Sequence, residues 1–409
     1  MDQVLIESEL VTRFLRYSAI DTQSNSKVTE IPSTPGQWKL AKLLVEELTE
    51  LGLSDVEIDE HCCVTAVLPG NGIAKDSIGF CAHLDTADVN LCSQVRAQVV
   101  KGYQGGIIEL GNGEVLDPKQ FPELNSYLGQ DIICTDGTSV LGADDKAAIA
   151  AIMTALHFIV ENKIPHGDVH IAFVPDEEIG LRGAKVLDLA KFSPKYAYTI
   201  DSAQLGELVF ETFNAGVAEV LIRGVSAHPM SAKGNMVNPN LIAVDLANTL
   251  NPDEVPERTE GREGYIWLQE LSGNQSTATV ILNIRDHDLK KYNEKKARIA
   301  EIVKSLQDKY PRAHISVKFE DVYGNISDAI TAENRSAIDD LEEVFSFLGI
   351  EPIYLAMRGG TDGSYLSSKG LLTPNFFTGA HNFHSVHEFL PVGSFRKSCE
   401  VILGLVERS

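Results

Sequence analysis

Acidic and histidine side chains stand at several points of this 409-residue chain where a strand-like apolar run ends. His83 and Asp85 follow the run 78–82, and Asp201 follows the run 196–200. Three consecutive acids at 176–178 follow the run 169–174. Ligand sites of α/β proteins usually form where neighbouring strands end, at the carboxyl edge of the sheet. We therefore expect these side chains to gather at one sheet edge.

Two further groups carry metal-binding side chains. Asp144 and Asp145 open an alanine-rich helix after Gly142, and the segment 381–388 reads HNFHSVHE. Acids at a helix start are also ordinary capping residues, and each of these histidines has an alternative explanation as a surface residue. Taken together, imidazole and carboxylate donors without thiolates suit a divalent cation with an open coordination position. Such a site indicates hydrolysis by water rather than a structural zinc site.

The order of these motifs resembles the co-catalytic two-zinc peptidases that include carboxypeptidase G and aminoacylase. Residues 83–85 are similar to the HxD motif of that family, 142–146 to its GxxDxK segment, 176–178 to its DEE triplet and 384–388 to its HxxxE ending. The stretches 103–146 and 357–363 look like the branch of the family that releases the first residue of tripeptides. The resemblance implies a metallo-aminopeptidase, a hydrolase that acts on short peptides.

The family pattern implies two zinc ions per chain. His83 and Asp201 would hold one ion, Glu178 and His384 would hold the other, and Asp144 would bridge them. In this family the peptide between the bridging aspartate and the next residue, here Asp144–Asp145, is commonly cis.

Two residues have catalytic roles in the same pattern. Asp85 would accept a hydrogen bond from the ring of His83 and fix its tautomer. Glu177 would be the general base: it would take a proton from the metal-bridging water and pass it to the leaving amine.

Four residues are candidates for binding substrate. His228, in the segment GVSAHP, resembles a family histidine that stabilises the oxyanion, in many relatives across a dimer interface. Arg285 and Arg358 could hold the terminal carboxylate of the substrate, because a guanidinium offers a planar fork of donors. Ordinary ion pairs explain each arginine equally well. Asn235 is a candidate for lining the same pocket.

Helix and strand signals alternate in the first half of the chain, with strands expected at 64–68, 78–83, 169–174 and 196–200. This alternation is typical of an α/β protein. We predict a discontinuous catalytic domain, 1–208 and 322–409, with a mixed sheet flanked by helices. Period-two alternation at 207–223, 277–285 and 314–319, with helical stretches between, predicts an inserted α+β lid domain at 209–321.

The composition narrows the class of partner. Lys and Arg total 35 and Asp and Glu total 58, a net charge of -23 that argues against nucleic acid and anionic membranes. The chain starts with an acidic segment and no basic region precedes an apolar run, so we expect no secretory signal. Six cysteines without CxxC spacing indicate reduced core residues, and we predict a cytoplasmic protein. A homodimer through the lid domain is a further expectation from the resemblance.

Two alternatives remain open at this point. A relative that acts on dipeptides, on N-acyl amino acids or on a carboxyl-terminal residue would share the same metal ligands. A metal-binding or scaffolding protein that kept the fold without catalysis is the other alternative, and the presence of Glu177 argues against it.

Overall fold

The computed structural model describes residues 3–72 and 76–409, and the chain divides into two compact units. Unit 1 comprises Met1–Phe210, Ala329–Leu355 and Thr361–Ser409; unit 2 comprises Glu211–Asp328 and Ala356–Gly360. The first two residues of the acidic opening segment lie outside the described residues. A lid role for the segment 209–321 stays a prediction.

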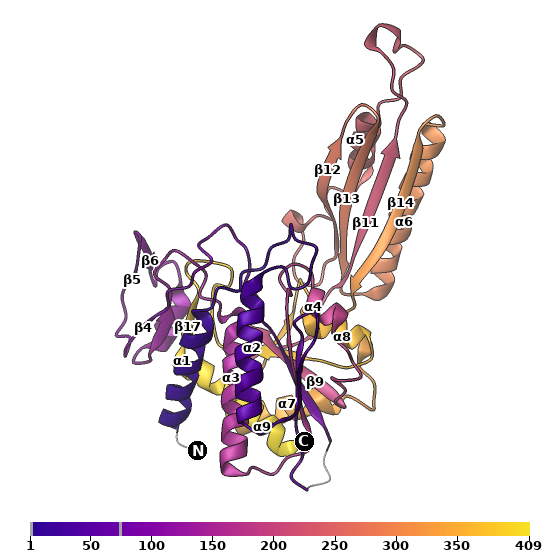
Figure 1. Cartoon of the computed structure of the whole chain (residues 1–409). Helices are drawn as coiled ribbons and strands as arrows, with labels where there is room; N and C mark the ends of the chain where they lie inside the picture. Colours follow the sequence, from indigo (N-terminus) through magenta and orange to yellow (C-terminus); the bar gives the residue numbers. More distant parts are fainter. Residues whose placement is uncertain (1–2, 73–75) are drawn as a thin grey trace. The chain divides into compact units, whose positions relative to one another are not determined.

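An eight-stranded mixed sheet forms the centre of unit 1 (Figure 1). Its strands are, in spatial order, β1 (Ser54–Ile58), β2 (Val64–Leu68), β8 (Val169–Val174), β3 (Ile78–His83), β9 (Tyr196–Ser202), β16 (Asn375–Phe377), β10 (Glu207–Glu211) and β15 (Ile353–Ala356). The four strands expected from apolar runs are present, because continuous apolar runs fit strands that are covered on both faces. The predicted fold class, a mixed sheet flanked by helices, is confirmed.

The register of the parallel strands β8, β3 and β9 brings their carboxyl ends to one level. His83 of β3 is paired with Val174, the last residue of β8, and Cys81 is paired with Thr199 of β9. Two residues further along, His83 is therefore level with Asp201. The HxD segment, the DEE turn and Asp201 thus leave the sheet side by side, as the sequence predicted.

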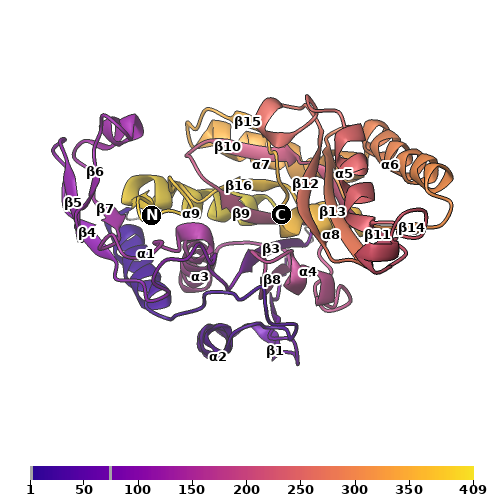
Figure 2. The same ribbon diagram turned by 90° about the horizontal axis from the view of Figure 1, so that it is seen from above.

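Helices cover both faces of this sheet (Figure 2). On one face lies α3 (Ala143–Asn162), with α1 (Gln3–Ser18) and α9 (Val392–Arg408) packed against it; the other face holds α8 (Asp362–Ser368) and, beside it, α4 (Arg182–Val186). The helix α3 is buried almost all round, which explains its lack of a polar face. The remaining helices of unit 1 are α2 (Pro35–Glu50), against β1 and β2, and α7 (Ser336–Phe347), against α9. No helix within residues 3–72 and 76–409 combines the length and apolarity that a membrane span requires.

A small substructure joins two distant parts of unit 1. The strands β4 (Gln98–Val100) and β7 (Ile132–Cys134) pair with β17 (Phe389–Pro391) from the end of the chain. The hairpin β5 (Ile108–Gly111) and β6 (Glu114–Leu116), with the short helix η1 (Pro122–Tyr127), completes its core. The inserted stretch between β3 and α3 therefore supports the segment that carries His384.

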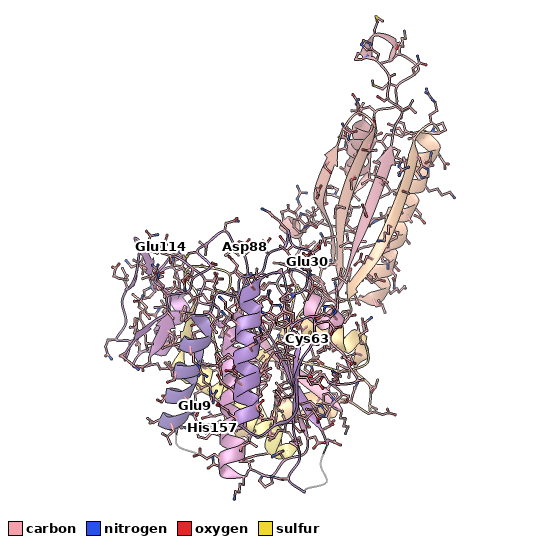
Figure 3. The ribbon with its side chains drawn as sticks, in the orientation of Figure 1. Glu9, Glu30, Cys63, Asp88, Glu114 and His157 are labelled. Carbon is pink, nitrogen blue, oxygen red and sulfur yellow. The ribbon has the colours of Figure 1, made fainter. Side chains whose placement is uncertain are left out.

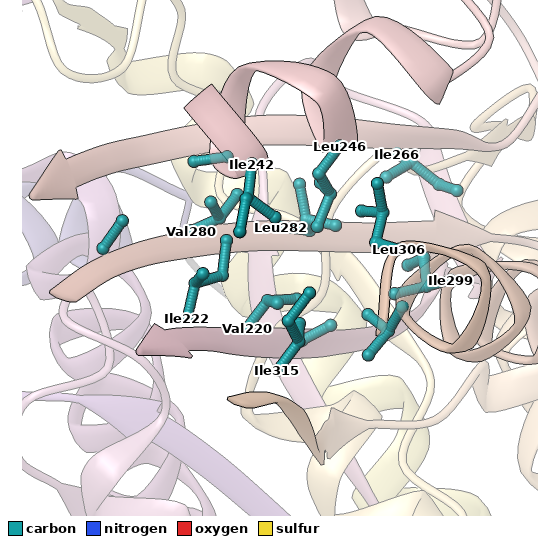
Figure 4. Close-up of a cluster of buried hydrophobic side chains, with 14 of the residues drawn as sticks. Val220, Ile222, Ile242, Leu246, Ile266, Val280, Leu282, Ile299, Leu306 and Ile315 are labelled. Carbon is teal, nitrogen blue, oxygen red and sulfur yellow. The ribbon is translucent and has the colours of Figure 1, made fainter. Parts of the chain in front are cut away.

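Unit 2 is built on a regular four-stranded antiparallel sheet. The order is β12 (Tyr265–Gly273), β13 (Thr277–Asp286), β11 (Asn214–Arg223) and β14 (His314–Tyr323). The helices α5 (Pro239–Thr249) and α6 (Leu289–Lys309) cover one face and enclose an apolar core (Figure 4). Short helical turns lie at η2 (Pro229–Ser231), η3 (Pro256–Arg258) and η4 (Ile326–Ala329). Strand β12 was not expected from the sequence, because it is mostly exposed and its apolar alternation is weak.

Candidate metal centre

Three of the predicted ligands meet at the carboxyl edge of the unit 1 sheet. Ligand atoms of His83, Asp144 and Glu178 all lie within 4.8 Å of one another. His83 ends β3, Glu178 follows β8 and Asp144 lies in the first turn of α3. Three segments far apart in the sequence therefore offer one nitrogen and two carboxylates to a common point.

The carboxylate of Asp144 lies between two imidazole rings. Its Oδ1 is 2.8 Å from Nε2 of His83, and its Oδ2 is 3.0 Å from Nε2 of His384. The same His384 nitrogen is 2.9 Å from Oε1 of Glu178. Asp144 thus presents one oxygen to each histidine, the arrangement that a carboxylate bridging two cations requires.

The backbone has unusual conformations at Asp144 and at His384. Before α3, Gly142 has φ 72°, and Asp144 itself has the non-helical angles φ -82° and ψ 99°. The Asp144–Asp145 peptide is cis, as the resemblance implied. His384 has φ 59°, a left-handed conformation that is uncommon for a side chain with a Cβ and that often marks functional sites.

Asp201 lies near this group without joining its closest contacts. Its backbone N–H donates to Oδ1 of Asn375 at 2.7 Å, which ties the end of β9 to β16. Burial, followed by the charge of Asp144, raises the pKa of Asp201 well above its usual value. Four of the five predicted ligands are thus linked by a chain of contacts, His83–Asp144–His384–Glu178, and Asp201 is their electrostatic neighbour. The ligand roles themselves stay predictions.

Asp85 organises the turn after β8 as well as His83. The Nδ1 of His83 is 3.0 Å from the carbonyl oxygen of Asp85 and 3.4 Å from its carboxylate. The carboxylate has shorter contacts with backbone amides: it accepts from Glu177 N at 2.9 Å and from Glu178 N at 3.2 Å. This fully buried residue therefore fixes the two adjacent glutamates in addition to the histidine.

Asp176, to which the sequence analysis gave no role, anchors the same turn from the other side. Its buried carboxylate accepts from Ser33 N at 2.8 Å, from Ser33 Oγ at 2.6 Å and from Gln37 Nε2 at 2.7 Å. Asp176 also has a positive φ of 55°. The only signal in the sequence was an acid ahead of the glutamate pair, because its partners lie about 140 residues away.

The two adjacent glutamates are buried close to other carboxylates at this edge. Burial, with the charges of Asp201, Asp362 and Glu178 adding to it, raises the pKa of Glu177 well above its usual value. Burial and the charge of Asp144 raise the pKa of Glu178 to about 7. A bound cation would relieve this desolvation and repulsion, since an opposite charge favours the ionised carboxylate. The donor set, two imidazoles and several carboxylates without a thiolate, fits a divalent metal.

Other histidine–carboxylate contacts in unit 1 are simple pairs. His157 Nδ1 lies 2.7 Å from Glu9 and joins α3 to α1 (Figure 3). His387 lies 3.2 Å from Glu114, which is labelled in the same figure, and its ring packs on Phe121. His157 also lies 3.9 Å from the exposed Glu161, and His387 has Glu114 as its carboxylate partner, so neither histidine belongs to a comparable donor set.

The four predicted substrate-binding residues all belong to unit 2. His228 and Asn235 are exposed in the connection between β11 and α5. Arg285 is a strand residue of β13; its Nη1 donates to the carbonyl of Gly216 at 3.1 Å, and it lies over the ring of Tyr323. Arg358 packs against the rings of Phe213 and Tyr265 and donates to the carbonyls of Gly261 and Glu263. More of the donors of Arg358 than of Arg285 are therefore engaged within the unit.

Comparisons with known proteins extend this picture to the whole chain. Residues 142–408 match a family model described as peptidase family M20/M25/M40. A peptidase T-like protein of Yersinia pestis is 49% identical over 97% of both chains, and a peptidase T of a Geobacillus species is 44% identical over 98% of both. The crystal structure of an aminopeptidase of Bacillus cereus is similar in fold, with a TM-score of 0.76 and 22% identity over 98% of both chains.

Proposed function

The chain belongs to peptidase family M20/M25/M40 and is a metal-dependent hydrolase, and from this premise we propose that it is a two-zinc tripeptide aminopeptidase. In the proposed reaction the enzyme releases the amino-terminal residue of short peptides. The names of the full-length relatives support a peptide substrate, and the 44% identical peptidase T supports the tripeptide class.

One observation carries the two-metal part of the proposal: Asp144 directs one oxygen to His83 and the other to His384. A carboxylate shared between two ions would face one ligand of each ion in this way. We assign His83 and Asp201 to one zinc ion, Glu178 and His384 to the other, and Asp144 to both. When bound, the ions would supply Lewis-acid chemistry that lowers the pKa of water and polarises the scissile carbonyl.

Glu177 moves the proton in this mechanism. Asp85 holds the backbone amides of both glutamates, so the turn that would offer Glu178 to the metal also fixes the position of Glu177. With cations bound beside it, the carboxylate of Glu177 would be ionised, as a general base must be. It takes a proton from the attacking water at its carboxylate oxygen and donates it to the departing amine nitrogen.

Unit 2 would bind the rest of the peptide. The proposal assigns the terminal carboxylate to Arg285 and Arg358 and oxyanion stabilisation to His228, with Asn235 in the same pocket. Arg285 is the stronger candidate of the two arginines, because the rings and carbonyls around Arg358 already occupy its guanidinium.

Location and assembly complete the proposal. A cytoplasmic enzyme agrees with six free cysteines, five of them buried. A homodimer through unit 2 is supported by the edge strand β12, on which Trp267 and Leu271 are exposed, and by Leu241 and Val244, which are exposed on α5. Analytical ultracentrifugation of the purified protein tests the homodimer, and the mass of a monomer would refute it.

A peptide panel tests the function. We expect the zinc-loaded enzyme to cleave Ala-Ala-Ala at its first bond, to cleave Ala-Ala slowly and to leave N-acetyl-Ala-Ala-Ala intact. A preference for the acetylated peptide, or release of the carboxyl-terminal residue, would overturn the aminopeptidase assignment in favour of an acylase or a carboxypeptidase. Equal rates on Ala-Ala would overturn the tripeptide assignment alone.

A further inference from the structure

A fully buried carboxylate behind the metal centre has no part in the mechanism above. Glu388 is 1% exposed and lies four residues after His384. Its Oε2 accepts from the backbone amides of Leu141 and Gly142 at 2.6 and 2.9 Å, and its Oε1 accepts from those of Ala143 and Asp144 at 2.8 and 3.3 Å. One side chain thus collects four consecutive amides.

The amides at the start of α3 need an acceptor from outside the helix. The first amides of any helix lack an acceptor within the helix. Here the N-cap, Gly142, has no side chain to cap them, and both Asp144 and Asp145 have non-helical angles. The amides also lie at the positive end of the helix dipole, where a negative charge is stabilised. Glu388, from a distant part of the chain, therefore accepts the hydrogen bonds that a capping side chain would otherwise accept.

The loop that supplies Glu388 also carries His384, and its ends are tied together. His381 and Phe389 exchange two backbone hydrogen bonds of 2.9 and 3.1 Å, and Glu388 N donates to the carbonyl of Ser385 at 3.2 Å. Thr135 Oγ1 donates to the carbonyl of Val386 at 3.2 Å. The spacing between His384 and the amides of residues 141–144 is consequently fixed by one short, closed loop.

We propose that Glu388 is a positioning residue whose carboxylate replaces the missing helix cap and fixes Asp144 so that it faces His83 and His384 together. The HxxxE motif then contains one proposed metal ligand, His384, and the residue that supports a second proposed ligand, Asp144, on α3. The metal at this site rests on the proposed function, whereas the hydrogen bonds of Glu388 do not.

The variant Glu388→Gln tests this role with little change of volume. An amide keeps one acceptor oxygen but directs an NH2 group at two backbone donors, so residues 141–144 lose half of their support. We expect the affinity for Co²⁺, measured by calorimetry on metal-free protein, to fall about 10- to 100-fold, as for other residues that orient ligands. The visible absorption spectrum of the Co²⁺-loaded protein should change, and kcat should fall while KM stays within about twofold.

Glu47→Gln is the matched control. Glu47 is also a buried carboxylate, but it accepts from Arg13, Arg16 and Tyr17 between α1 and α2. We expect it to lower the melting temperature and to leave Co²⁺ affinity and spectrum unchanged. Glu388→Asp keeps the charge on a shorter side chain and should recover part of the affinity that Glu388→Gln loses.

Wild-type Co²⁺ affinity and spectrum in Glu388→Gln would overturn the proposal, as would equal losses in Glu388→Gln and Glu47→Gln. If Glu388→Gln does not fold, the comparison of Glu388→Asp with wild type decides: unchanged affinity and spectrum at lowered stability would reduce Glu388 to a purely structural role. Wild-type protein that binds two Co²⁺ ions but cleaves no tripeptide would refute the proposed function and leave this inference standing.

Discussion

The two units position their polar side chains by opposite means. In unit 1 the site residues stand at or just after strand ends and at the start of α3, and buried carboxylates each accept several hydrogen bonds there: Asp85 from two backbone amides, and Asp176 from Ser33 and Gln37. In unit 2 a regular sheet with an apolar core carries Arg285 on the face opposite its two helices, since the neighbouring Ile284 points into that core. The predicted metal site of unit 1 depends on a polar network, whereas in unit 2 the apolar core is separate from the residues that we propose for substrate binding.

The two adjacent glutamates of unit 1, Glu177 and Glu178, have different proposed roles, and their variants should differ accordingly. We expect Glu177→Gln to lower kcat by about 10²- to 10⁴-fold, the usual contribution of a general base, and to retain both metal ions. Glu178→Gln, one residue away, should instead weaken metal binding. Steady-state rates with metal analysis distinguish the two, and full turnover in Glu177→Gln would mean that the base lies elsewhere.

The core of unit 2 should respond in stability and not in metal binding. Leu282 is fully buried under α5, and Leu282→Ala should destabilise the protein by about 3 kcal/mol through the cavity it leaves. The exposed Leu271 is the matched control, and Leu271→Ala should change stability by less than about 0.5 kcal/mol. Denaturant unfolding measures both, and a loss of metal from Leu282→Ala would contradict the separation between the units.

Asp85 is proposed to position the two glutamates without touching the substrate, so its substitution should still reduce function. Asp85→Asn leaves one amide of the glutamate turn facing an NH2 group, and we expect about a 10- to 100-fold loss of metal affinity or activity. Asp88→Asn serves as the control, because Asp88 is exposed and accepts hydrogen bonds from Gln23 and from the backbone amide of Asn90, away from the glutamate turn. Equal behaviour of the two variants would show that the contacts of Asp85 are dispensable.

The smallest expected effect belongs to the surface of unit 2. Arg285→Ala should raise KM for Ala-Ala-Ala about tenfold, because a charge-assisted hydrogen bond is lost, and should leave KM for Ala-Ala-Ala-amide unchanged. Arg358→Ala, assayed in parallel, identifies which arginine reads the carboxylate. An unchanged ratio of acid to amide KM in both variants would remove both arginines from substrate recognition.

Many of the strands of unit 1 were predictable because buried strands have mostly apolar sequences. The strands at 64–68, 78–83 and 169–174 are continuous apolar runs, and the structure has them at the same residues. The exposed edge strand β12 carries no such run and was missed. Within the site, the motif positions came from resemblance, but the acceptors for the amides of residues 141–144 and 177–178 depend on tertiary contacts across as many as 247 residues. No local pattern reports contacts of that kind.

Crystals of the zinc-loaded enzyme, with anomalous scattering recorded at the zinc edge, test the metal centre most directly. We predict two peaks, one coordinated by His83 and Asp201 and the other by Glu178 and His384, each about 2.0–2.2 Å from a different oxygen of Asp144. A single peak, or two peaks that do not share Asp144, would contradict the two-metal centre.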